Sequence, residues 1–363
     1  MTEAITADLL LKHGAVQSGN GCRGPATNEM CYNAVSSPGG EGRYQQCHLS
    51  TNQKPQSILS ILTLKARHLN ARYEQFLERK FPNFYTLYST FMKGFRMLLV
   101  DGKDVRMIKM NMRSRGLKYY QLPYREMEKL RQFRRDIIKA APVMIISIPP
   151  FANYLVFVLM YFFPRQMLIR HFWTPRQQQE FLEIYHNMRK EVYGDVLESL
   201  QIAASKVSKE PLHNRMVQLF TQVQNGAHPQ LTDIESIKAA FSGPPLCMTE
   251  LDIPQMKALS RIMFLTPHLP GFFLKRWLKS HVLEIWHLDA ALLQLGIDEL
   301  TDEEVKRACY LRGLNSTNLG TEACRRWLSC WIQLSGKLEV SEASLLLHSM
   351  VLLSTNYHQS LKD

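Results

Sequence analysis

The sequence predicts an all-α protein with a disordered N-terminus, basic membrane-proximal helices, one proline-kinked transmembrane helix and a C-terminal helical domain. Three observations lead to this fold class. Beyond residue 58 apolar residues recur at helical spacing, and no stretch alternates apolar and polar residues as a strand does. Residues 140–163 form one uncharged, mostly apolar run. Hydrophobic residues make up 45% of the 363 and charged residues 21%, which is enough apolar material for a sizeable core.

Residues 1–58 are rich in glycine, serine, asparagine and glutamine and show no lasting periodicity. Such a composition cannot bury enough apolar surface to order the chain, so we predict disorder over this segment. It is poor in arginine and carries acidic residues, which is atypical of a mitochondrial transit peptide, and nothing in it resembles a secretory signal. A targeting role for the segment stays open.

Residues 59–139 hold 19 basic and 7 acidic residues, so this block carries the whole net charge of +12. A concentrated basic block predicts an anionic partner, either lipid headgroups or nucleic acid. Four basic residues recur at helical spacing with apolar residues on the opposite side, as in an amphipathic helix at an anionic interface. These candidate lipid contacts are Lys103, Arg106, Lys109 and Arg113. The alternative is an ordinary helix that packs on the rest of the protein.

The uncharged run predicts a transmembrane segment over residues 140–164. As a helix its 24 residues would rise about 36 Å, more than a hydrocarbon core of about 30 Å. Pro149, Pro150 and Asn153 lie near the middle of the run. The two prolines cannot donate backbone hydrogen bonds, so the segment must either kink or form a re-entrant hairpin. The alternative is a buried core helix.

For residues 165–363 the sequence predicts a helical domain with an internal repeat. Residues 251–265 align with residues 300–314, and a basic-aromatic helix follows each copy. In the second copy, Thr301 and Glu304 predict a capping box and Gly313 a C-terminal cap. Two basic pairs near the start of the following helices are candidate phosphate contacts, with a solvated surface as the alternative. These residues are Lys275, Arg276, Arg325 and Arg326.

The sequence predicts no enzyme, no cofactor and no metal site. It contains no nucleophile elbow, phosphate-binding loop, dinucleotide fingerprint or metal-spaced cluster of histidine and cysteine. The seven cysteines include no CxxC pair, which argues against a zinc ribbon and a disulfide-stapled secreted domain. Cys309 is expected to be a small buried apolar residue rather than a nucleophile.

Several motifs, taken together in order, resemble those of the LETM family of mitochondrial inner-membrane proteins, most closely its short vertebrate members. The resemblance covers about residues 84–355. Its motifs are LPYREMEKLRQFRRD at 122–136, the pairs Pro150-Phe151 and Phe163-Pro164, LTDEEVKRACYLRGL at 300–314, and Trp331 with the leucines at 345–347. The resemblance implies an all-helical LETM-type domain in the matrix, behind a single span. It also implies binding of mitochondrial ribosomes through this domain, cation/proton exchange, and a role in organelle volume and cristae shape.

Three residues of the predicted span depart from the family pattern. Asn153 stands where the family usually carries a glutamate, Phe157 where it carries a proline, and Tyr161 where it carries a lysine. An ion exchanger needs an ionisable group or a polar cage at membrane depth. The chain also has no EF-hand loop. The resemblance therefore supports the family's fold and its binding domain more strongly than its transport activity.

These observations lead to three hypotheses. The first is a single-pass inner-membrane adaptor that binds the mitochondrial ribosome or assembly factors and supports mitochondrial structure and respiratory function. Its partners would be anionic mitochondrial lipid, ribosomal proteins, and either a second copy or other LETM family members. The second is a subunit of a potassium/proton or calcium/proton exchange system, and the third a nucleic-acid-binding regulator. Outer membrane and nucleus stay open as locations, and the charge of the flanks opposes a matrix-facing C-terminal domain.

Overall fold

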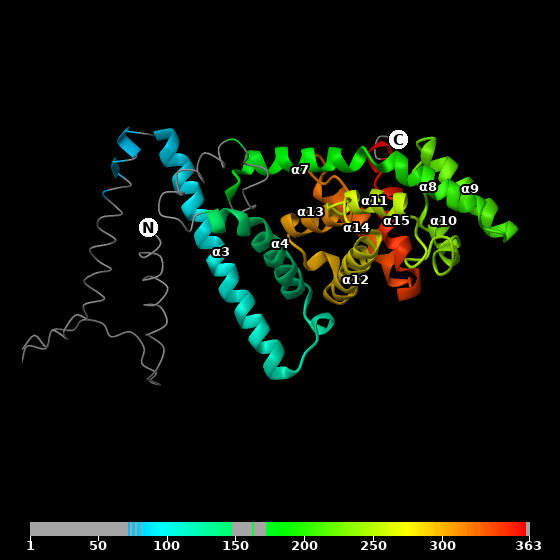
Figure 1. Cartoon of the computed structure of the whole chain (residues 1–363), viewed down its shortest axis with the longest axis horizontal. Coiled ribbons are helices and arrows are strands. Elements are labelled where there is room, and N and C mark those ends of the chain that lie inside the picture. Colours follow the sequence, from blue (N-terminus) through cyan, green and yellow to red (C-terminus); the bar gives the residue numbers. More distant parts are fainter. Residues whose placement is uncertain are drawn as a thin grey trace, which may run out of the picture. The chain divides into compact units, whose positions relative to one another are not determined.

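The computed structural model describes residues 82–146 and 172–360, together with a few single positions outside these ranges (Figure 1). The chain divides into two compact units, residues 1–89 and 90–363, and the second holds nearly all of the described residues. Every regular element in the described ranges is a helix, which confirms the all-α prediction for this part of the chain. Residues 1–58, for which the sequence predicts disorder, lie outside the described residues.

The N-terminal helices of the described chain are α3 (Pro82–Arg115), η1 (Tyr119–Gln121) and α4 (Tyr124–Ile146). A group of shorter elements follows: α7 (Pro175–Lys190), α8 (Tyr193–Ser205), α9 (Glu210–Gln224), α10 (Leu231–Ser236) and η3 (Lys238–Phe241). The repeat comprises α11 (Ile253–Ile262), α12 (Gly271–Leu295), η4 (Ile297–Glu299), α13 (Asp302–Leu311) and α14 (Thr321–Gly336). The chain then continues through η5 (Val340–Glu342), α15 (Ala343–Leu352) and α16 (Tyr357–Ser360).

Helices α3 and α4 contact each other through side chains around Gly102 of α3. Gly102 of α3 lets the Phe133 ring of α4 approach to 3.4 Å of the position that a Cβ would take. Lys129 of α4 forms ion pairs with Asp101 (3.5 Å) and Asp104 of α3. Val105 of α3 is buried. The side of α3 that carries Val105 and Ile108 is therefore covered by the protein itself.

Helix α4 joins the basic block to the start of the predicted transmembrane segment without a break. It runs through residue 140 to Ile146 and contains Pro142. The rest of that segment, with Pro149, Pro150 and Asn153, lies outside the described residues, apart from the single position Phe162. Among the residues that the structure describes, no helix combines the length and the apolar character needed to cross a membrane.

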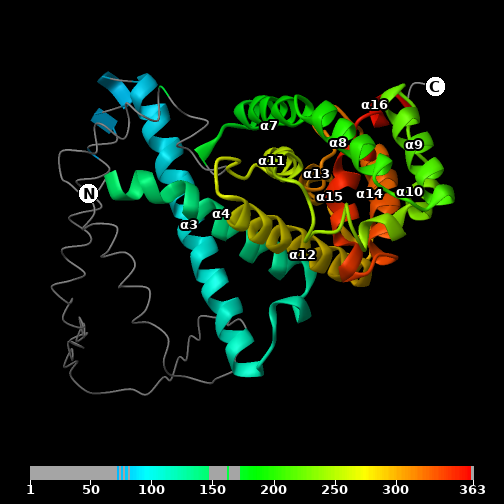
Figure 2. The ribbon, with the colours of Figure 1, turned by 45° about the vertical axis from the view of Figure 1, so that its right-hand side comes forward.

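The main core lies among α8, α9, α11, α12, α14 and α15. All ten residues of α15 are buried, which is typical of a central core helix, and α15 contacts both α8 and α12 (Figure 2). The Trp327 and Trp331 rings of α14 stack with their centroids 5.5 Å apart. Cys309 is fully buried, as the sequence predicts.

A buried ion pair ties α12 to α13 and α14. The Arg312 guanidinium lies 2.6 Å from the Asp289 carboxylate, and both side chains are almost fully buried. The same carboxylate accepts hydrogen bonds from Trp331 Nε1 (2.9 Å) and Ser335 Oγ (2.7 Å). These bonds compensate for the desolvation of the carboxylate, so that breaking this network from one side would leave an unpaired buried charge.

A second polar cluster joins α4 to α12 around the buried carboxylate of Glu284. Arg134 lies 2.6 Å and Arg131 3.4 Å from its oxygens, and His281 lies 3.6 Å away. Burial alone would raise the pKa of Glu284, but His281 and the two guanidiniums outweigh burial and lower this pKa to about 2. The carboxylate therefore stays ionised and holds α4 on the main core.

Candidate interaction surface

The repeat predicted from the sequence is present in the backbone. Helices α11 and α13 are ten residues long each and start and end at matching positions, 49 residues apart. Thr301 and Glu304 form the predicted capping box at the start of α13, with Thr301 N donating to Glu304 Oε2 (2.9 Å). Asp252 occupies the N-cap position of α11.

Both helices of the repeat end in the same left-handed turn. Phe264 after α11 has a φ of 55° and the matching Gly313 after α13 a φ of 112°. In each turn the backbone N–H of the next leucine donates to a carbonyl of the helix. Leu265 N donates to the Ser260 carbonyl (2.8 Å), and Leu314 N donates to the Cys309 carbonyl (3.2 Å). The predicted cap at Gly313 is confirmed, whereas no local signal predicts a phenylalanine in the matching position.

Arg189 of α7 binds both of these helix ends and contacts the ring of the left-handed phenylalanine. Its side chain is buried and donates to the carbonyls of Ile262 (2.9 Å) and Tyr310 (2.8 Å). Its guanidinium lies over the Phe264 ring at 4.3 Å and the Tyr310 ring at 4.9 Å. Burial lowers the pKa of Arg189, but the negative ends of two helix dipoles and two aromatic faces favour the cation. Sequence reasoning missed this residue because its partners are far away in the chain.

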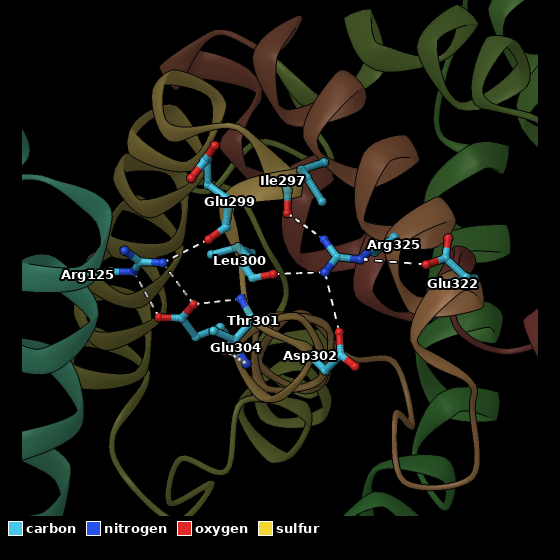
Figure 3. Close-up of polar contacts among 9 residues, drawn as sticks. All are labelled: Arg125, Ile297, Glu299, Leu300, Thr301, Asp302, Glu304, Glu322 and Arg325. Atoms are coloured by element: carbon cyan, nitrogen blue, oxygen red, sulfur yellow. Dashed lines mark hydrogen bonds and ion pairs between the residues drawn. The ribbon is translucent and has the colours of Figure 1, made fainter.

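Two of the four predicted phosphate contacts bind the protein's own backbone. Lys275 Nζ of α12 donates to the Thr249 carbonyl (2.5 Å). Arg325 of α14 donates to the carbonyls of Ile297 and Leu300, both at 2.9 Å (Figure 3). These two residues match in the repeat, and each one holds the loop that precedes the first helix of its own unit. We call them the inner pair.

The other two candidates, Arg276 and Arg326, are exposed. We call them the outer pair. They follow the inner pair directly in sequence and therefore point about 100° away around their helices. Contact with phosphate stays a prediction, and it now falls mainly on the outer pair.

The loop before α13 is also held from the side of α4, by a residue that sequence reasoning missed. Arg125 Nε lies 3.0 Å from Glu304 Oε1, and Arg125 Nη2 donates to the Glu299 carbonyl at 2.8 Å (Figure 3). Burial would raise the pKa of Glu304, but the hydrogen bond from Thr301 and the Arg125 guanidinium lower it. The loop is thus fixed between Arg125 and Arg325.

The four candidate lipid contacts on α3 are all exposed, as the predicted stripe requires; they are Lys103, Arg106, Lys109 and Arg113. Apolar residues are exposed along the same helix, namely Met97, Val100, Met107 and Met110. The outward side of α3 therefore offers both positive charge and apolar side chains. Such a surface has the composition of a helix that lies on an anionic interface, and the lipid contact stays a prediction.

A second exposed apolar surface surrounds the start of α12. Its residues Phe272, Phe273 and Trp277 are 70%, 50% and 43% exposed, and Ile253 of α11 is 53% exposed. We call these four residues the aromatic patch. The sequence signal for it is the pair of phenylalanines in the first turn, which helical periodicity alone does not assign to a buried or an exposed side. Among the described residues, no group of three or more His, Cys, Asp or Glu side chains is arranged to hold a metal ion.

Residues 122–352, which include α4 and the whole repeat, match the family model described as "LETM1-like, RBD". The chain is 66% identical over 320 residues to the LETM1 domain-containing protein 1 of Xenopus tropicalis, covering 88% of this chain and 91% of that protein. The Homo sapiens protein of the same name is 51% identical over 318 residues, covering 88% of each chain. The mitochondrial proton/calcium exchanger protein of Drosophila melanogaster is 29% identical over 269 residues, covering 72% of this chain and 26% of that protein.

Proposed function

This chain belongs to the LETM1-like family, and on that ground we propose that it is an adaptor anchored in the mitochondrial inner membrane. Its helical body binds the mitochondrial ribosome or its assembly factors and so supports mitochondrial structure and respiratory function. Residues 140–164 provide the single membrane span, and the body faces the matrix. The observation that carries the proposal is the family match over the helical body with its repeat.

The surface chemistry of the body supports this proposal. The outer pair places Arg276 and Arg326 at matching positions of the repeat, both exposed. Exposed arginines suit phosphate contact because the guanidinium donates two parallel hydrogen bonds to phosphate oxygens. The basic and apolar outward side of α3 suits an anionic membrane surface, to which each Lys or Arg contributes about 1 kcal/mol.

The test uses the full-length chain, because Leu122, Tyr124 and Met127 at the start of α4 belong to the main core. A fragment that begins after the predicted span would lack them. Mitochondria that express the tagged chain are solubilised in mild detergent and sedimented through a sucrose gradient at low and at physiological salt. The chain is expected to sediment with the mitochondrial ribosome and to dissociate as salt rises.

The variant that carries Arg276→Glu and Arg326→Glu tests the outer pair. Each phosphate contact that is lost weakens binding and reduces the slope of log K against log salt concentration by about one. The variant should therefore dissociate from the ribosome at physiological salt. Arg215→Glu is the matched control, because Arg215 is an exposed arginine on α9. If the wild-type chain stays with the free proteins at low salt, the adaptor proposal is wrong. If the double variant sediments like the wild type, the outer pair has no part in binding.

A subunit of a cation/proton exchange system is the second candidate function. The similarity to the Drosophila exchanger favours it, although the chain spans about a quarter of that protein's length. Proton flux coupled to potassium or calcium in proteoliposomes of the full chain would support exchange. Flux that is unchanged by Asn153→Leu and by Pro150→Ala would remove the predicted span from the transport path.

A nucleic-acid-binding regulator away from the membrane is the third candidate. It rests on the basic block of residues 59–139 and on the helix–loop–helix repeat, which is loosely similar to SAP-type DNA-binding units. Alkaline carbonate extraction distinguishes it from the other two. Release of the chain into the supernatant would favour this function, and retention in the membrane pellet would favour an anchored protein.

A further inference from the structure

The two units of the repeat differ in what covers their second helix. Helices α12 and α14 start 50 residues apart, so Phe273 matches Ala323 and Trp277 matches Trp327. Trp327 is 1% exposed, whereas Trp277 is 43% exposed. The local sequences around the two tryptophans are nearly the same, KRWL and RRWL. The difference in burial therefore comes from the neighbouring segments.

The C-terminal end of α15 and the turn after it cover α14 at these positions. Trp327 Nε1 donates to the carbonyl of Leu353, which is the C-cap of α15 (3.0 Å). Tyr357 Oη donates to the carbonyl of Ala323 (2.7 Å). The occupant of this site is thus the last turn of a helix, with a carbonyl that accepts the indole N–H and an aromatic ring that follows.

The matching positions of α12, Phe273 and Trp277, belong to the aromatic patch, which the described residues leave exposed. The Phe272 and Phe273 rings meet edge to face, with centroids 5.6 Å apart. Ile253 approaches to 3.7 Å of the position that a Cβ on Gly271 would take, which brings the start of α11 beside the start of α12. The patch is therefore one surface, which two neighbouring helices build.

The charges around the aromatic patch are mainly positive. Arg276 and Lys279 of α12 and Lys257 of α11 are exposed. Asp252, next to Ile253, already pairs with Lys206 (3.2 Å). An occupant with carboxylates around its apolar side chains would complement this charge, and the negative end of a helix dipole would add to the attraction.

We propose that the aromatic patch docks the C-terminal turn of an acidic amphipathic helix from a partner protein, in the way that the end of α15 docks on α14. Trp277 takes the role of Trp327, and its indole N–H donates to a carbonyl at the end of the partner helix. Phe272, Phe273 and Ile253 receive the apolar side chains of that helix. Aromatic side chains supply most of the contact area of this docking, and Arg276 adds positive charge to it. Arg326 lies in the other unit of the repeat and is not part of the docking surface.

The test uses the full-length chain in lipid nanodiscs and two labelled helical peptides. Both peptides carry leucine along one face, and the remaining positions are glutamate in one and lysine in the other. Fluorescence anisotropy is expected to show binding of the glutamate peptide and at least about tenfold weaker binding of the lysine peptide. Phe273→Ser and Trp277→Ser should each weaken the glutamate peptide by at least about tenfold, as expected for central aromatic anchors.

Val217→Ser on α9 is the matched control, since Val217 is also an exposed apolar residue, and it should leave peptide binding unchanged. Arg326→Glu should likewise leave it unchanged, which separates this docking from ribosome binding. Equal affinity of the wild type and both patch variants would overturn the proposal. So would quenching of Trp277 by brominated lipid, measured against Trp277→Phe, because the bilayer would then be the occupant. A dimer that Phe273→Ser dissociates would assign the patch to a second copy of the chain and would equally overturn it.

Discussion

Gly313 is the position at which a single added methyl group should destabilise this protein most clearly. It ends α13 with a φ of 112°, a conformation that L side chains rarely adopt. A Cβ at this position would lie 2.7 Å from the backbone oxygen of Met350 and 3.1 Å from its Cβ. Because Met350 belongs to the buried helix α15, this backbone cannot move aside without disturbing the core.

Two effects add up in Gly313→Ala. The backbone strain of a non-glycine residue at such a φ costs about 1–3 kcal/mol. Overpacking against a buried backbone costs about 1–3 kcal/mol more. We therefore expect a loss of about 2–6 kcal/mol in the free energy of unfolding, which lowers the Tm by roughly 4 °C or more for a unit of this size.

The measurement is thermal unfolding of the full-length chain followed by near-ultraviolet circular dichroism, which reports on the stacked Trp327 and Trp331 rings. Gly194→Ala is the matched control, because Gly194 lies in α8 with open space around its Cβ position and no positive φ. This control should raise stability by about 0.5–1 kcal/mol. A Tm of Gly313→Ala within about 2 °C of the wild type would refute the reasoning, because no combination of the two costs is that small.

Three further predictions concern the polar contacts of the core and the repeat. Asp289→Asn leaves the buried Arg312 without its counter-ion and should cost about 3–5 kcal/mol in urea unfolding. Asp289→Leu should cost at least as much, because it also removes the acceptor of the hydrogen bonds from Trp331 Nε1 and Ser335 Oγ, and a leucine variant as stable as the wild type would contradict this. The folded-state pKa of Glu284, about 2, lies below its ordinary value, so its contribution is complete above about pH 5 and is lost as the pH falls toward 2. This contribution to the free energy of unfolding amounts to about 3 kcal/mol. Glu284→Gln should therefore reduce the loss of stability between about pH 5 and pH 2, and an unchanged loss would show that this carboxylate does not cause it. Arg325→Gln should cost about 1–3 kcal/mol because the backbone carbonyls lose a charged donor, whereas Arg326→Gln should change stability by less than about 0.5 kcal/mol; equal effects in thermal unfolding would deny the division into an inner and an outer pair.

Local signals predicted the repeat well. The helix of the second unit begins at the Thr301 cap and ends before Gly313, as the spacing of capping residues indicates. Such caps act between residues three to six apart in the chain, so the sequence contains all the partners they need. Phe264 shows where this reasoning fails. Its backbone is left-handed and its ring lies under the guanidinium of Arg189, which belongs to another helix, and no residue near Phe264 in sequence signals this contact.

The four candidate phosphate contacts could be found from the sequence, but their division into an inner and an outer pair could not be predicted. Lys275 and Arg276 are neighbours of similar chemistry, and the same holds for Arg325 and Arg326. Their roles differ because one residue of each pair faces a loop of its own repeat unit and the other faces outward. Which side of a helix faces a loop depends on how the helices of each unit pack together, which composition and spacing do not encode directly.

Residue pattern was sufficient for the helical class, the charged stripe on α3, the repeat and its caps, because periodicity and capping are interactions between near neighbours in the chain. Whether a residue at a matching position of the repeat is buried depended on packing between segments far apart in the chain. Trp277 and Trp327 occupy the same place in nearly the same local sequence, yet α15 covers one of them and leaves the other exposed. Contacts between segments far apart in sequence form only when the whole chain folds, so the aromatic patch becomes visible only in three dimensions.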